Sequence, residues 1–139
     1  MLKRLLFASL FAALAVTMSH ALDHQAKIVI PIGSTSPADG KQMYTSYCAP
    51  CHGVDGRGHG TASSALKVPA TDLSKLAAAN GGKFPVTHLV AVLRYGLDHK
   101  SEGMPAWNQI FTRMTHANSM MSDQRTSNLV EYLRTLQAK

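Results

Sequence analysis

Hydrophobic positions divide the chain into one nearly continuous apolar run, residues 5–16, and several short amphipathic segments after it. The clearest amphipathic repeat lies near the end of the chain, in Leu129, Val130, Leu133 and Leu136. Spacings of three, four and seven residues bring side chains to one helical face, so we expect a helix that begins at Ser122. No stretch keeps up a period of two. The pattern predicts an all-α fold of four or five short helices joined by long loops.

Capping and breaking residues indicate where the other helices lie. Ser36 can cap a helix that has Pro37 in its first position and ends at about Tyr47. Shorter helices are expected over residues 71–79, from Pro85 to Gly96, and over residues 108–114. The glycine-rich stretch 53–60 and residues 99–107 are expected to be loops. So many loops leave a small side-chain core, which a large buried cofactor would complete.

The apolar run at the start has the features of a secretory signal. Lys3 and Arg4 precede it, and small residues, Ser19 and Ala21, stand at the two positions that a signal peptidase reads. The run is shorter than the roughly 20 residues of a membrane-spanning helix. We therefore expect residues 1–21 to be a cleaved signal peptide, with no transmembrane span in the mature chain. An uncleaved anchor is the alternative.

Residues 22–36 resemble an extended leader before a domain over residues 37–139. The leader includes a short β-branched run at residues 27–32 and a loop-like Gly-Ser-Thr-Ser sequence at residues 33–36. The formal net charge of the chain is +6, with no run of Lys and Arg. This argues against nucleic-acid binding. A mildly positive field would favour encounter with an acidic protein partner.

The strongest chemical signal is Cys48-Ala49-Pro50-Cys51-His52, the C-x-x-C-H pattern of covalent haem attachment. Two thiols three positions apart can form thioethers with the two vinyl groups of one porphyrin. The imidazole of His52 then stands beneath the iron. The pattern predicts one haem c.

A pair of cysteines at this spacing has two other common uses. A zinc half-site would need further ligands, for which His59 or His99 is available, but the chain has no second cysteine pair. A redox dithiol would need a βαβ context, which the pattern does not predict. Haem attachment remains the favoured interpretation.

The second axial ligand distinguishes an electron carrier from a haem enzyme. Met104 is the best candidate, because it lies in a Gly-Met-Pro-Ala-Trp loop, and a thioether stabilises ferrous iron. Met114 is an alternative thioether, and His88 or His99 would give a bis-histidine iron.

These motifs together resemble the bacterial class I cytochrome c family. The resemblance covers about residues 37–138 and rests on CAPCHG at 48–53, the following VDGRGHG loop, GMPAW at 103–107 and the terminal helix. It implies a fold in which the first and last helices cross closely. Gly40 and Tyr44 match the crossing positions on the first helix, and Tyr132 and Leu133 match those on the last.

The resemblance also suggests residues around the haem. Pro69 is expected to offer its carbonyl to Nδ1 of His52, which would orient the ring. Trp107 and Arg94 are expected to form hydrogen bonds with the haem propionates. The alternative for each is that it is an ordinary packing or surface residue. Tyr95 and Phe84 are expected to be ordinary core residues.

The sequence thus predicts a periplasmic single-haem carrier that exchanges electrons with redox protein partners. It would act as a diffusible protein or as a small subunit of an oxidoreductase complex, and would not itself be an enzyme. A haem enzyme or gas sensor with an open axial position is the alternative. It is disfavoured because such four-helix cytochromes carry the attachment motif near the C-terminus. A purely structural or binding role is a third hypothesis.

Overall fold

The structure is a computed structural model that describes residues 32–97 and 104–138. Within these ranges it is all-helical, as predicted. The α-helices are α2 (Gly40–Met43), α3 (Ala49–His52), α4 (Leu76–Ala79), α5 (Val86–Tyr95), α6 (Trp107–Met114) and α7 (Ser119–Thr135). A π-helical turn, η1 (Tyr44–Cys48), and two 3-10 turns, η2 (Ser63–Ala65) and η3 (Leu73–Lys75), complete them. The predicted signal peptide, residues 1–21, lies outside the described residues.

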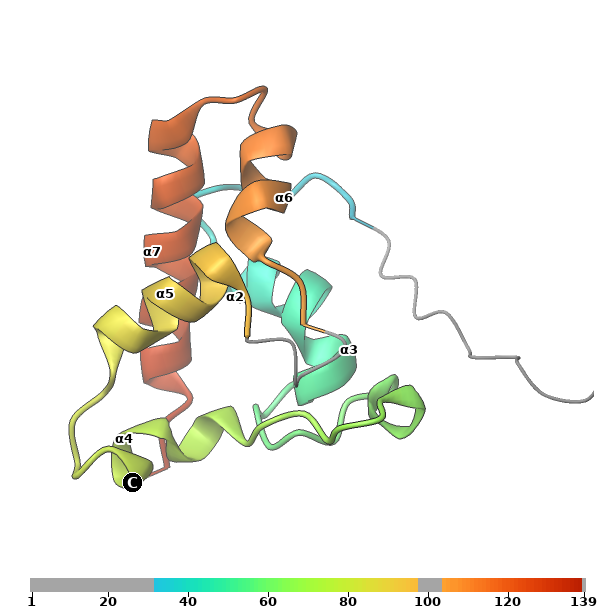
Figure 1. Cartoon of the computed structure of the whole chain (residues 1–139), viewed down its shortest axis with the longest axis vertical. Helices are drawn as coiled ribbons and strands as arrows, with labels where there is room; N and C mark the ends of the chain where they lie inside the picture. Colours follow the sequence, from blue (N-terminus) through green and yellow to red (C-terminus); the bar gives the residue numbers. More distant parts are fainter. Residues whose placement is uncertain (1–31, 98–103, 139) are drawn as a thin grey trace, which may run out of the picture.

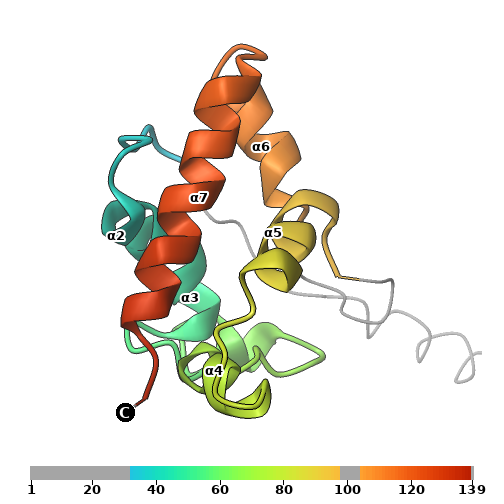
Figure 2. The same ribbon diagram turned by 90° about the vertical axis from the view of Figure 1, so that its left-hand side faces the viewer.

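The long helix α7 organises the packing. Figures 1 and 2 show α2 crossing it on one side, with α5 and α6 against it on the other. The helix begins at Ser119, three residues before the predicted Ser122, because the side chain of Asn118 caps it by accepting from Met121 N at 3.1 Å. No helix in the described part of the chain is long and apolar enough to cross a membrane.

The first helical segment runs without a break through α2, η1 and α3. Its predicted N-cap, Ser36, is wrong: Asp39 is the cap, and its carboxylate accepts from Gln42 N at 2.8 Å. A carboxylate both satisfies a free N–H and faces the positive helix end. The segment also continues past Tyr47 to His52, where Gly53 turns the chain with a φ of +79°. The whole attachment motif is therefore helical.

The expected crossing of the first and last helices is confirmed. Gly40 lies so close to α7 that a Cβ atom there would run into the carbonyl oxygen of Asn128. The rings of Tyr44 and Tyr132 meet beside this contact, with centroids 5.3 Å apart, and Leu133 is buried in the core. A side chain at position 40 would force the two helices apart.

The other elements follow the predicted boundaries with small differences. The helix expected over residues 71–79 is divided into η3 and α4, and α6 begins at Trp107. The expectation that Tyr95 is a core residue is wrong, since its side chain is 76% exposed. Tyr95 ends α5 on the side opposite the buried Leu89 and Leu93. Phe84 is half-buried beneath the guanidinium of Arg134, 4.8 Å from its ring centroid.

We predict that Gly40→Ala destabilises the protein by about 1–3 kcal/mol, because the added methyl group overlaps the α7 backbone. Thermal unfolding of the full chain measures this change. Gly33→Ala is the matched control, since a Cβ at Gly33 meets no atom within 4 Å. Equal stability of the two variants would show that the helices do not cross as closely as described.

Candidate functional site

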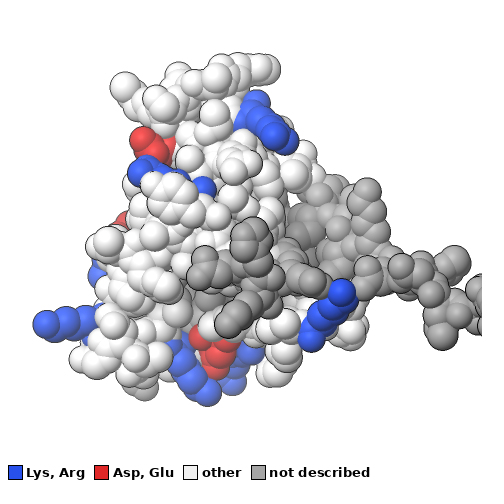
Figure 3. All heavy atoms as spheres, viewed as in Figure 1, with Lys and Arg blue, Asp and Glu red and all other residues white. Residues whose placement is uncertain are grey.

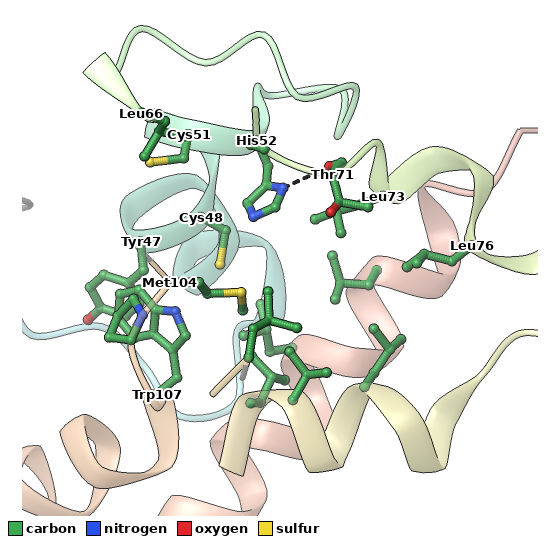
Figure 4. A pocket seen from close by; sticks show the side chains of 18 of the residues that line it. Tyr47, Cys48, Cys51, His52, Leu66, Thr71, Leu73, Leu76, Met104 and Trp107 are labelled. Atoms are coloured by element: carbon green, nitrogen blue, oxygen red, sulfur yellow. Dashed lines mark hydrogen bonds between the residues drawn. The ribbon is translucent and has the colours of Figure 1, made fainter. Parts of the chain in front are cut away.

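The continuous helical segment formed by α2, η1 and α3, residues 40–52, is called the attachment helix. An apolar pocket lies between this helix, the separate segment 66–76, helix α5, the start of α6, and α7 (Figure 4). Its lining includes the aliphatic side chains of Leu66, Val68, Leu73, Leu76, Leu89, Val92, Leu93, Leu129 and Leu133. Segments far apart in the sequence therefore share one hydrophobic space. Such a lining suits a large, flat, apolar group.

Cys48, Cys51 and His52 all line this pocket. Residues three and four positions apart lie on the same side of a helix, so the helical conformation turns both thiols and the imidazole toward one space. Burial raises the pKa of the Cys48 thiol to about 12, and it also raises that of Cys51. The two sulfur atoms are therefore uncharged near neutral pH.

The glycine-rich loop after His52 folds back onto the attachment helix. Gly58 N donates to the carbonyl of His52 at 2.7 Å, and Gly60 N donates to that of Cys51 at 3.1 Å. A Cβ at Gly60 would collide with the carbonyl oxygens of Ala49 and Pro50. The loop thus satisfies carbonyl groups that the helix end leaves free.

The imidazole of His52 is oriented by Thr71, not by Pro69. Nδ1 donates to the carbonyl oxygen of Thr71 at 2.9 Å (Figure 4). The prediction that the Pro69 carbonyl accepts this hydrogen bond is therefore wrong, although Pro69 still lines the pocket. The reason is register: Leu73 N donates to the Gly56 carbonyl at 2.6 Å, and this pairing brings Thr71 beside the ring.

The environment of His52 favours a neutral imidazole. Burial lowers its pKa below the usual value, and the hydrogen bond to Thr71 partly opposes this effect. A neutral imidazole that donates through Nδ1 keeps its Nε2 lone pair for a metal ion. His52 is thus prepared to act as an axial ligand.

The candidates for the opposite axial ligand differ in whether they line the pocket and in how exposed they are. Met104 lines it, and Figure 4 shows Met104 across the pocket from His52. His88 also lines the pocket, but its side chain is exposed. Met114 packs against the core outside the lining, and His99 lies outside the described residues.

The two predicted propionate contacts differ in their surroundings. Trp107 lines the pocket, is 3% exposed and stacks on Tyr47 with ring centroids 5.4 Å apart. Arg94 does not line the pocket, and its Nη2 bonds Oδ1 of Asp123 at 3.1 Å. Trp107 remains a predicted propionate contact, whereas the guanidinium of Arg94 is engaged on another surface.

Three residues near the site were not found by sequence reasoning. Thr71 acts through a carbonyl that any residue could supply, so its identity gives no signal. Tyr47 lies beside the attachment motif and lines the pocket. Arg125 occupies the buried face of α7, four positions before Leu129, and this helical spacing was the available signal.

The donor set fits haem c. It combines two uncharged thiols on one helical turn, a neutral imidazole beside them, a thioether across the pocket and an apolar lining. Among the described residues, no three His, Cys, Asp or Glu side chains gather closely enough to hold a metal ion. The zinc interpretation therefore finds no support in this part of the chain.

Comparison with known proteins agrees with this site. The Cytochrome c family model matches residues 37–137, so the chain belongs to the cytochrome c family, whose members bind haem c and transfer electrons. No curated protein and no solved structure matched the chain. The resemblance to cytochrome c inferred from the motifs is confirmed.

We predict that Asp72→Ala speeds hydrogen exchange at Nδ1 of His52 in the haem-loaded protein. The Asp72 carboxylate accepts from Ser74 N at 2.9 Å and from Ser74 Oγ at 2.6 Å, which fixes the chain just after Thr71. Nuclear magnetic resonance of the ring N–H proton measures the exchange.

The matched control is Asp39→Ala, which removes the capping carboxylate of α2 at a residue that does not line the pocket. Either loss of a cap should cost about 0.5–2 kcal/mol of stability. Only the variant at Asp72 should change the His52 proton. An equal effect of both variants on this proton would contradict the role of the segment after Thr71.

Proposed function

We propose that this protein is a single-haem electron carrier in which His52 and Met104 are the axial ligands of the iron. Cys48 and Cys51 would hold the haem through thioether bonds. The observation that carries the proposal is the arrangement of His52 and Met104 on facing sides of one apolar pocket. Two ligands from the protein leave no open position for a substrate, which favours electron transfer over catalysis.

Met104 is preferred to His88 because of its surroundings. The thioether is neutral and apolar, so its presence in a hydrophobic pocket carries no large desolvation cost. The exposed imidazole of His88 can instead remain hydrated. A methionine ligand would also give a higher reduction potential than a second histidine.

Each part of the site then has a task in electron transfer. When bound, haem c supplies an iron that alternates between the ferric and ferrous states. The Thr71 carbonyl keeps the His52 ring in one orientation. The aliphatic lining excludes water, so few dipoles need to reorient when an electron arrives or leaves. The two thioether bonds keep the cofactor in place through repeated cycles.

We further propose that the carrier acts in the periplasm. Residues 1–21 have the composition of an export signal. Its partners would be redox proteins that donate and accept single electrons, whether the carrier diffuses or belongs to a larger complex. Charged side chains on the face in Figure 3 are spread among uncharged ones and include more Lys and Arg than Asp and Glu. This distribution suits weak steering toward acidic partners.

We predict that Met104→Ala abolishes the red absorption band that a thioether bond to ferric iron produces. The iron would then have an open position and would bind added imidazole or carbon monoxide. Absorption spectroscopy of the purified, haem-loaded variant measures both changes.

Met114→Ala is the control, because Met114 packs against the core without lining the pocket. It should keep the band and exclude added ligands. Survival of the band in the variant at Met104 would show that another residue binds the iron.

A further inference from the structure

Arg125 is a buried cation that forms no ion pair with an acidic side chain in the described part of the chain. Its side chain is 5% exposed, on the core face of α7. Nη1 donates to Oγ1 of Thr35 at 2.8 Å, and Nη2 donates to the carbonyl of Thr35 at 2.6 Å. Nε finds no hydrogen-bond partner among residues 32–97 and 104–138. A buried guanidinium usually has a carboxylate beside it, because desolvation of an unpaired charge is costly.

The neighbouring carboxylates on α7 are engaged elsewhere. Asp123 pairs with Arg94 at 3.1 Å, and Glu131 pairs with Arg134 at 3.2 Å. Among the described residues, no Asp or Glu forms an ion pair with Arg125. Its charge is therefore not neutralised within this part of the protein.

A polar chain leads from this charge to the pocket. Arg125 donates to Thr35 Oγ1, which lies 2.9 Å from the Tyr47 hydroxyl, and Tyr47 in turn donates to the Gly33 carbonyl at 2.6 Å. Because the Tyr47 proton is directed to Gly33, the hydroxyl of Thr35 donates to Tyr47. In each of these three hydrogen bonds, the donor then lies on the side of the cation and the acceptor oxygen on the far side. This orientation of the dipoles stabilises the positive charge of Arg125.

Aromatic side chains connect Arg125 to the pocket lining. Its Cζ lies 5.9 Å from the ring centroid of Phe111, and that ring lies 5.8 Å from Trp107. Tyr47 and Trp107 both line the pocket. Phe111 and Tyr47 are fully buried, so little water intervenes to screen the charge.

We propose that Arg125 raises the reduction potential of the haem. The inference rests on the proposed function, because it requires an iron that cycles between two oxidation states in this pocket. The ferric state carries one more positive charge than the ferrous state. A buried cation in contact with the aromatic cluster beside the pocket repels that extra charge and favours the reduced form. Thr35 accepts both hydrogen bonds from the guanidinium and so keeps the charge in this position.

Redox titration of the full, haem-loaded protein tests this role. Arg125→Gln should lower the midpoint potential, so that the ferric-to-ferrous ratio rises several-fold at the wild-type midpoint. Arg113→Gln removes the same charge from an exposed position on α6 and should leave the ratio nearly unchanged. An unaltered potential in Arg125→Gln would overturn the proposal and leave Arg125 a structural clamp.

Two variants at Thr35 separate charge from packing and do not depend on Arg125→Gln folding. Thr35→Val removes the hydroxyl but keeps the cation, so it should lower the thermal stability with little change in potential. Thr35→Asp adds a carboxylate beside the guanidinium and should lower the potential as Arg125→Gln does. Equal potentials in the two variants would contradict an electrostatic role.

The absorption spectrum of the wild-type protein distinguishes failure of the proposed function from failure of the role of Arg125. If the wild-type protein lacks the thioether–iron band, the His52 and Met104 assignment fails. If the band is present and the potentials of the charge variants do not move, only the role of Arg125 fails.

Discussion

The close approach of Gly40 to the Asn128 carbonyl determines how the attachment helix lies on α7. Tyr44, one turn later, is fully buried beside Tyr132, and its hydroxyl donates to the carbonyl of Gly53 at 2.6 Å. Burial raises the pKa of this phenol, which therefore remains a neutral donor. The bond secures the chain directly after His52. The Gly40 contact and the Tyr44 hydrogen bond therefore hold the beginning and the end of the same helical segment.

The parts of the site that depend on local chemistry could be predicted from the sequence. Cys48, Cys51 and His52 are neighbours in the chain, so their spacing alone defines the attachment motif. Gly40 could be found because it matches the small position that the cytochrome c resemblance implies at the helix crossing, where a close approach needs a residue without a side chain. The fold class followed from helical periodicity, as in Leu129, Val130, Leu133 and Leu136 of α7.

Other features depend on contacts between distant segments, and these could not be predicted. The acceptor for His52 is Thr71 because a backbone hydrogen bond between Gly56 and Leu73 sets the register of that segment. Both Ser36 and Asp39 can cap a helix, and only the folded chain shows which one does. Arg125 looks like a surface residue by type, yet Thr35, assigned to the leader, contributes to its burial. The leader assigned to residues 22–36 therefore contacts the core at its end.

The proposed function requires an iron with both axial positions filled by the protein's own side chains, His52 and Met104. Exposure of the reduced, haem-loaded wild-type protein to carbon monoxide tests this claim most directly. We predict an unchanged absorption spectrum, because ligation by both His52 and Met104 would leave no site for the gas. Stoichiometric binding of carbon monoxide at neutral pH would contradict it and would indicate an open iron suited to catalysis or gas sensing.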